Sequence, residues 1–322
     1  INYIHRKTEN EDVYFFYNPE NEARTYLCTF NIEGKIPELW NQMTGEVTKL
    51  AAFTSENGQT KALISLPAEG SVFVVFRESS KGIQSIVPKS LKSNEDVTTT
   101  LTNDNTIEVE VKASGNYNFK LNDGSLKVIK VKNLPEQITV SGTWSVDFPD
   151  VKAKEKNFSF PKLIDWTSHK NEQIKYYSGT AIYKNEFVVG KNYLEENNKV
   201  TLDLGEVNIA AKVIVNGKDL GVSWMPPYVL DVTKALVKGK NTIQIEVTNQ
   251  WTNRLIGDEN FPSESGMSRK NEYMPDWYLN NEPPPLKQRS TFTTFPFYKK
   301  GDETIPAGLL GPVVIKTSKT TK

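Results

Sequence analysis

The side chains best suited to a chemical role are aromatic and polar residues in the last third of the chain. The apolar C–H face of a sugar ring stacks on Trp or Tyr, while amide and guanidinium groups hydrogen-bond to its hydroxyls. Residue types of this kind therefore predict a carbohydrate-binding site made of Trp224, Trp251, Arg254, Trp277 and Tyr278. Tyr228, Asn249 and Asn253 are candidates for further contacts. Packing against a sheet is the alternative for Trp224, whereas Trp40, Trp144 and Trp166 are expected to be packing residues.

Groups for covalent or metal chemistry are scarce. The two histidines, His5 and His169, lie far apart, and Cys28 is the one cysteine, so neither a zinc site nor a Ser-His-Asp triad is expected. We expect Cys28 to point into a sheet core, with a reactive thiol as the alternative. No cofactor is expected. Loop carboxylates leave a structural calcium ion open, although no EF-hand spacing is present.

Paired carboxylates remain as a catalytic option, because glycoside hydrolysis needs two acids roughly 5 to 9.5 Å apart. Six acids lie in or beside the segment 252–291, namely Asp258, Glu259, Glu264, Glu272, Asp276 and Glu282. We interpret them as solvated or paired with Arg254, Arg269 and Lys270, and we predict no catalytic residue in this chain. A catalytic pair among the loop acids is the alternative.

The overall charge excludes several classes of partner. Lys plus Arg and Asp plus Glu both number 39, so the formal net charge is zero and no field favours nucleic acid or an anionic membrane. No stretch approaches the roughly 18 apolar residues of a membrane span. The chain starts at Ile1 without a methionine or a signal-peptide pattern, and we interpret Ile1 as a boundary within a longer protein.

Strand and turn signals alternate along almost the whole chain, which predicts an all-β protein with tandem β-sandwich domains. Strands at 13–17, 25–30, 62–66 and 71–76 indicate a small β-sandwich over 1–80. Residues 81–137 are predicted to be a linker followed by a β-meander, with strands at 106–111, 117–121 and 126–131. A larger domain, closed as a sandwich or a jelly roll, is predicted over 138–322.

The larger domain has the clearest local signals. Its strands are predicted at 138–148, 179–187, 199–204, 211–216, 228–232 and 242–248, with closing strands at 291–297 and 312–315. Asn216-Gly217 predicts a tight hairpin, Asp165 a helix cap, and Thr233 the cap of a short helical turn. The strand signal stops over 252–291, far beyond a usual loop of roughly 4 to 6 residues, which favours a functional or ordered irregular segment.

Blocks in this order resemble known glycoside hydrolases. Residues 177–183, 200–207, 213–221, 230–233, 239–242 and 247–249 are similar to the sugar-binding domain of family 2. This resemblance implies that the domain over 138–322 is a galactose-binding-like jelly roll. Residues 3–6, 12–15, 37–40, 70–76, 251–259, 291–294 and 308–312 resemble the α-L-rhamnosidase family numbered 106. The resemblance covers nearly the whole chain and becomes weaker over 81–137.

This resemblance implies a role rather than a catalytic site. In that family the catalytic acids lie on an (α/β)-barrel that would precede Ile1. The chain would then be the non-catalytic C-terminal region of a bacterial, exported enzyme, located in the periplasm or outside the cell. Its expected partners are a plant or other glycan and the N-terminal catalytic barrel. Whether the chain itself is an enzyme stays open, and purely structural β-domains that support the barrel are a further alternative.

Overall fold

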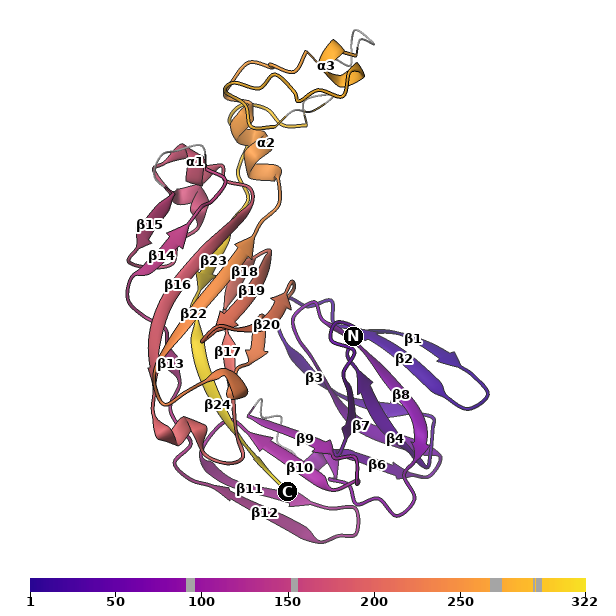
Figure 1. The fold of residues 1–322 in the computed structure, drawn as a ribbon. Helices are drawn as coiled ribbons and strands as arrows, with labels where there is room; N and C mark the ends of the chain where they lie inside the picture. Colours follow the sequence, from indigo (N-terminus) through magenta and orange to yellow (C-terminus); the bar gives the residue numbers. More distant parts are fainter. Residues whose placement is uncertain (91–95, 152–155, 267–273, 292, 294–296) are drawn as a thin grey trace. The chain divides into compact units, whose positions relative to one another are not determined.

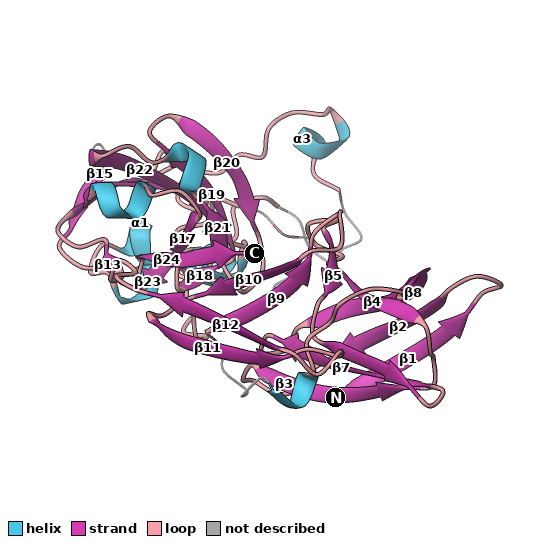
Figure 2. Ribbon diagram, turned by 90° about the horizontal axis from the view of Figure 1, so that it is seen from below, coloured by secondary structure: helices cyan, strands magenta, loops and turns pink. Residues whose placement is uncertain are grey.

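The computed structural model describes residues 1–90, 96–151, 156–266, 274–291, 293 and 297–322. Antiparallel strands dominate and the helices are short, so the expected all-β class is confirmed (Figures 1 and 2). The chain forms two compact units. The first contains 1–137, 192–200 and 316–322, and the second contains 138–191 and 201–315.

The first unit contains a long antiparallel sheet and a smaller three-stranded sheet. In spatial order the long sheet contains β1 (Asn2–Lys7), β2 (Asp12–Tyr17), β8 (Ser71–Ser79), β4 (Lys35–Trp40), β5 (Val47–Leu50), β9 (Val97–Leu101) and β10 (Ile107–Val111). The smaller sheet contains β3 (Arg24–Phe30), β7 (Gln59–Leu66) and β6 (Phe53–Glu56). Segment 81–137 carries η1 (Pro88–Ser90), β9, β10 and the hairpin of β11 (Gly115–Lys120) with β12 (Leu126–Val131).

Alternation along the strands builds the core of this unit. Tyr14, Phe16, Val74 and Phe76 occupy every second position of β2 and β8, and all four belong to one buried cluster with Phe30 of β3. Because successive side chains on a strand point to opposite faces, these residues share one face of the long sheet. Aromatic edge contacts fill the cluster, for example the Tyr14 and Phe30 rings with centroids 4.9 Å apart.

Cys28 on β3 is partly buried and packs against this cluster, as expected. Burial raises the pKa of the Cys28 thiol to about 11, so the reactive thiolate forms only at strongly alkaline pH. We expect alkylation by iodoacetamide at pH 8 to be roughly 100-fold slower in the folded chain than in the urea-unfolded chain. Equal rates, measured by mass spectrometry, would contradict this assignment.

The second unit contains one main sheet and several short strand pairs. The main sheet runs in the order β15 (Asn157–Phe160), β14 (Trp144–Asp147), β16 (Thr180–Val189), β22 (Gly239–Thr248), β19 (Ala210–Val215) and β20 (Lys218–Ser223). The pairs are β17 (Asn198–Asp203) with β21 (Val229–Asp231), β18 (Glu206–Asn208) with β23 (Gly308–Gly311), and β13 (Ile138–Thr139) with β24 (Val314–Thr321). Only residues 201–203 of β17 and 314–315 of β24 belong to this unit, and the rest of both strands belongs to the first. Helical turns of this unit are η2 (Trp166–Ser168), α1 (Glu172–Lys175), η4 (Thr233–Ala235), α2 (Thr252–Asp258) and α3 (Asp276–Leu279), whereas η3 (Lys191–Leu194) lies almost entirely in the first unit.

Aromatic residues fill the core of the second unit. Trp144 and Trp166 are only 2% and 0% exposed, which confirms their predicted packing role. The indole N–H of Trp166 donates to the hydroxyl of Tyr183, which also accepts from the Leu309 backbone N–H at 3.3 Å. Burial raises the pKa of Tyr183, so this hydroxyl stays neutral. Its two hydrogen bonds connect β16 to η2 and to β23.

Three local predictions can be checked in this unit. The carboxylate of Asp165 accepts from Thr167 N at 2.9 Å and thereby caps η2, as predicted. Asn216 and Gly217 have φ values of 51° and 77° and join β19 to β20, which confirms the hairpin. The Thr233 cap is wrong, because the carboxylate of Asp231 accepts from Thr233 N at 2.9 Å and Thr233 is already the first residue of η4.

Candidate functional site

Trp224 and Trp251 lie at the same end of the main sheet of the second unit. Ser223 on β20 is opposite Ala211 on β19, and Ala211 is opposite Val247 on β22. Because neighbouring strands are about 4.8 Å apart, Ser223 and Val247 are separated by about 10 Å. Trp224 follows Ser223 directly, and Trp251 follows four residues after Val247. Their side chains are 56% and 66% exposed, so both present aromatic surface there.

Other apolar side chains are exposed around the β20 hairpin. Val222 is 59% exposed and Ile209 is 40% exposed. Tyr228, by contrast, is buried, and its hydroxyl donates to the Ile209 carbonyl at 2.7 Å. Tyr228 therefore stabilises the backbone at Ile209, and its ring is not part of the exposed aromatic surface.

The amides expected to contact a ligand are engaged within the fold. Asn249 accepts from Gly179 N at 3.0 Å and donates to the Tyr177 carbonyl at 2.9 Å. Asn253 is 1% exposed and makes both of its contacts, at 2.8 and 2.9 Å, with the backbone of Ile305. Both side chains thus connect α2 and the end of β22 to distant backbone, and neither offers its amide to a ligand.

Arg254 has a similar internal partner on α2. Its Nη2 atom lies 3.1 Å from Oδ1 of Asp258, four residues later, and its side chain is 18% exposed. Space around it is limited, because a Cβ at Gly257 would lie 2.6 Å from Arg254 Nη2 and 2.5 Å from Cγ of Tyr176. The guanidinium therefore pairs with a carboxylate of its own helix, α2. This helix follows β22 in the chain (Figure 1).

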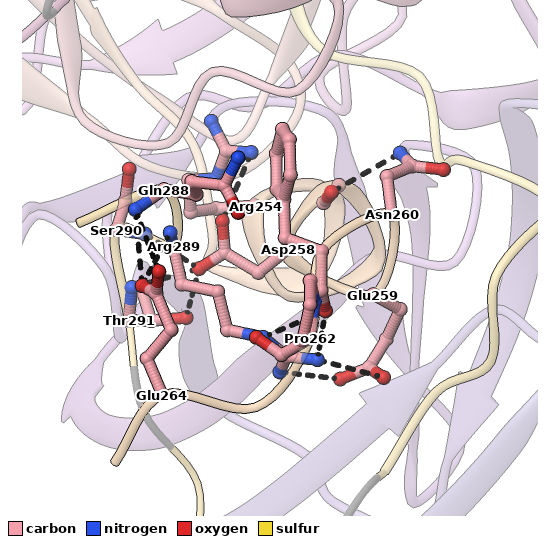
Figure 3. A network of polar contacts seen from close by, with 12 residues as sticks. Arg254, Asp258, Glu259, Asn260, Pro262, Glu264, Gln288, Arg289, Ser290 and Thr291 are labelled. Atoms are coloured by element: carbon pink, nitrogen blue, oxygen red, sulfur yellow. Dashed lines mark hydrogen bonds and ion pairs between the residues drawn. The ribbon is translucent and has the colours of Figure 1, made fainter. Parts of the chain in front are cut away.

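Asp258 connects α2 to the chain as it returns near residue 290. Its side chain is buried, and its Oδ2 atom accepts from Ser290 N at 3.0 Å, Thr291 N at 2.7 Å and Thr291 Oγ1 at 2.6 Å (Figure 3). A buried carboxylate with this many donors and an arginine beside it stabilises both segments that it joins.

Two further acids complete this connection. The carboxylate of Glu264 accepts from three consecutive backbone N–H groups, those of Lys287, Gln288 and Arg289, at 2.8 to 3.1 Å. The Arg289 guanidinium donates to Glu259 at 3.0 and 3.4 Å and to the Phe261 and Pro262 carbonyls (Figure 3). We call this set the loop clasp, made of Arg254, Asp258, Glu259, Glu264 and the backbone of 287–291 with the Arg289 side chain.

The loop clasp shows the surroundings of some of the six acids in or beside the segment 252–291. Three of the six, Asp258, Glu259 and Glu264, are held by backbone or arginine partners. Asp276 and Glu282 are exposed, and Glu272, with Arg269 and Lys270, lies outside the described residues. The predicted ion pair of Arg254 is present, with Asp258 as its partner. The strand predicted over 291–297 lies mainly on residues that the structure does not describe.

A small pocket adjoins the loop clasp. It contains about 230 Å³ of empty space, part of it open to solvent. Its lining includes Leu255, Asp258, Glu259, Arg289, Thr291, Thr293, Phe297 and Tyr298. The charged groups in the lining, Asp258, Glu259 and Arg289, are paired within the loop clasp.

Trp277 and Tyr278 lie side by side on α3. Their rings are nearly perpendicular, at 89°, with centroids 5.9 Å apart. Trp277 is partly buried, and its indole N–H donates to the Ser265 carbonyl at 2.6 Å. Tyr278 is 51% exposed and Leu279 is 67% exposed. Trp277 therefore anchors α3, while Tyr278 presents its ring to solvent.

Neither metal nor membrane features stand out in the described part of the chain. Among those residues, no group of three or more His, Cys, Asp or Glu side chains is placed to hold a metal ion. No helix among them is long and apolar enough to cross a membrane.

Comparison with known proteins gives two family matches. Residues 1–55 match the α-L-rhamnosidase model of glycoside hydrolase family 106. Residues 163–283 match the galactose-binding domain-like model of glycoside hydrolase family 2. The second match covers most of the unit that carries Trp224, Trp251 and the loop clasp.

Two longer proteins are similar across most of the chain. A curated protein of Formosa agariphila named "Putative beta-glucuronidase" is 36% identical over 81% of this chain and 22% of its own length. The structure of a rhamnosidase from Novosphingobium sp. PP1Y is 27% identical and covers 98% of this chain and 24% of that chain, with a TM-score of 0.67. The chain thus spans about a quarter of each.

These matches confirm both resemblances seen in the sequence. The chain is therefore similar to part of larger glycoside hydrolases, with a match to family 106 α-L-rhamnosidase sequence at residues 1–55 and to a family 2 galactose-binding-like domain at residues 163–283.

Proposed function

We propose that this chain is an accessory carbohydrate-binding and scaffold region of an α-L-rhamnosidase-like glycoside hydrolase, without the catalytic barrel. The observation that carries the proposal is the pair of exposed tryptophans, Trp224 and Trp251, at one end of the main sheet of a galactose-binding-like domain. Trp and Tyr rings present the flat apolar surface on which a sugar ring stacks. Tyr278 is a further exposed ring of this unit.

The contacts of the polar residues define which groups belong to the proposed surface. Arg254, Asn249 and Asn253 have partners inside the fold, so we place them beneath the surface as positioning residues. Trp277 is likewise an anchor, because its N–H already donates to Ser265. The proposed contacts are therefore Trp224, Trp251 and Tyr278, with Val222 as apolar surround.

The loop clasp supports a non-catalytic role. A glycosidase needs one carboxyl group as acid and a second as base or nucleophile, both able to reach the substrate. Asp258 is buried against Arg254, and Glu259 and Glu264 are bound to Arg289 and to backbone N–H groups. These three acids hold a loop in place and are not placed to act on a substrate. We assign hydrolysis to a catalytic region that this chain would serve.

The proposed partners and location follow from the same role. We propose a glycan ligand that contains L-rhamnose or a related sugar, and a catalytic barrel as the protein partner. A glycan-degrading enzyme of this type acts where polysaccharide is available, so we place it in the periplasm or outside the cell of a bacterium.

We expect Trp224→Ala and Trp251→Ala each to weaken glycan affinity by about 10-fold, since aromatic contacts contribute about 0.5–1.5 kcal/mol beyond their buried area. Calorimetric titration with L-rhamnose-terminated oligosaccharides measures the effect. Tyr3→Ala is the matched control, because Tyr3 is an aromatic residue, 63% exposed, in the other unit. An unchanged affinity in both tryptophan variants would contradict the proposed surface.

A further inference from the structure

The long sheet of the first unit carries apolar residues on both of its faces. Tyr14 and Phe16 of β2 point into the buried core cluster, but Phe15 between them is not part of that cluster. The same is true on β8, where Val74 belongs to the cluster and Phe73 does not. Antiparallel sheets usually alternate apolar and polar residues when one face meets water. This sheet departs from that pattern.

The outward side chains line up across five neighbouring strands. Ile4 is opposite Phe15, Phe15 is opposite Phe73, Phe73 is opposite Trp40, and Trp40 is opposite Val47. We call these five residues the apolar row. With about 4.8 Å between strands, the row extends for about 19 Å.

Members of the apolar row remain accessible. Ile4 and Val47 at its two ends are 55% and 45% exposed. Phe15, Phe73 and Trp40 in the middle are partly exposed, and the Phe15 and Phe73 ring centroids are 5.1 Å apart. Contiguous apolar surface of this kind marks a contact site for another molecule.

A buried carboxylate paired with a partly exposed arginine fixes the central part of this surface. Glu38 is 0% exposed and accepts from Arg77 Nε at 2.9 and 3.1 Å. Its Oε2 atom also accepts from the Trp40 indole N–H at 2.8 Å, and the Arg77 guanidinium lies 5.1 Å from the Trp40 ring centroid. Trp40 and Arg77 are thus held in one arrangement, and Trp and Arg are the residue types that dominate binding energy at protein interfaces.

The chemistry of the apolar row favours a protein over a sugar. Its ends are aliphatic, its two phenylalanines carry no hydrogen-bonding group, and the Trp40 N–H is already bound to Glu38. Sugar hydroxyls would find few partners along it, whereas apolar protein surface would be complementary.

The family matches identify the kind of protein. Residues 1–55, which match the α-L-rhamnosidase model, contribute four of the five row residues, and the similar rhamnosidase is about four times as long as the matching region. We propose that the apolar row is the docking surface for the catalytic region of the rhamnosidase-like enzyme. This inference rests on the scaffold part of the proposed function.

The test measures binding between two separately produced polypeptides. One is the 322-residue chain, and the other is the catalytic region encoded by the same gene. We expect a complex in sedimentation velocity and a dissociation constant that rises at least about 30-fold in the Phe15→Ser/Phe73→Ser double variant. Because both side chains lie outside the buried cluster, the melting temperature of the isolated double variant should stay close to that of the unchanged chain.

Val128→Ser is the matched control, since Val128 is 54% exposed on β12 of the same unit and should leave the dissociation constant unchanged. An unchanged constant in the double variant, the lack of any complex, or a gene without a catalytic region would overturn the proposal. Two other results would also overturn it. If the double variant abolished self-association of the chain, the apolar row would bind a second copy. If it abolished glycan binding, the apolar row would bind a sugar. Trp224→Ala should lower glycan affinity without changing this constant, so the two proposals fail separately.

Discussion

Asp258→Ala is expected to destabilise the second unit by about 3–5 kcal/mol, the cost of leaving a buried charge without its partner. The substitution removes the acceptor of the Ser290 and Thr291 N–H groups and leaves the Arg254 guanidinium, 18% exposed, without its carboxylate. We also expect the segment between 259 and 291 to become sensitive to protease, because the loop clasp closes its two ends. Urea unfolding and limited proteolysis measure the two effects.

Asp219→Asn is the matched control for this prediction. Asp219 also lies close to a basic side chain, with 3.0 Å to Lys212 Nζ, but its carboxylate is 56% exposed. Exposed pairs of this kind contribute little to stability. We expect no measurable change in unfolding or in cleavage for Asp219→Asn. Equal behaviour of the two variants would show that the buried clasp is not what stabilises the loop.

Gly205→Ala should be the second large effect, a loss of about 2–5 kcal/mol from a strained backbone and a forced shift of packed elements. Gly205 has a φ of +65°, and a Cβ there would lie 2.4 Å from the carbonyl carbon and oxygen of Gly311. Those atoms are backbone, so no side chain can rotate away. The β18–β23 pair must move instead, which thermal unfolding of the variant would detect as a lowered melting temperature.

Gly217→Ala separates the two causes of that loss. Gly217 has a similar φ of +77° in the β19–β20 turn, but a Cβ added there would have no neighbouring atom within 4 Å. Only the conformational cost of about 1–2 kcal/mol is then expected. If both substitutions lowered the free energy of unfolding by the same amount, the close approach of Gly205 to Gly311 would not contribute to the loss.

Local chemistry explains which parts of the fold were predictable. Asn216-Gly217 needs two positive φ angles, and few residue pairs other than Asn-Gly supply them, so the hairpin was evident. The Asp165 cap was also predictable, because its carboxylate accepts from the backbone N–H of Thr167, only two residues further along the chain. In contrast, β1 is exposed along its whole length and has no burial pattern to detect, and β4 contains Pro37, which argues against a strand.

The candidate site was predictable only in part. Aromatic residues after β20 and β22 could be named from the sequence. The exposure of Trp224 could not be predicted, because the apolar residues Met225, Pro226 and Pro227 beside it fitted packing against the sheet equally well. The partners of Asn253 and Asp258 could not be named, because Ile305 and Thr291 lie 52 and 33 residues further along the chain. The spacing of Arg254 and Asp258, four residues apart, was the available signal for α2.

The two similar proteins bear different names, and this affects the choice of ligand. One is named as a β-glucuronidase and the other as a rhamnosidase, and each is about four times as long as the region it shares with this chain. Oligosaccharides that end in D-glucuronate serve as comparison ligands for those that end in L-rhamnose in the test of the proposed function. A preference between them would give the proposed surface a substrate class.

Calorimetric titration of the purified chain with L-rhamnose-terminated oligosaccharides tests the central claim most directly, because binding and hydrolysis give different heat signals. An accessory binding region predicts saturable heats that disappear in the Trp224→Ala/Trp251→Ala double variant, with no sustained heat of hydrolysis after each injection. A sustained heat of hydrolysis, or no binding to either these or the D-glucuronate-terminated oligosaccharides, would contradict the account.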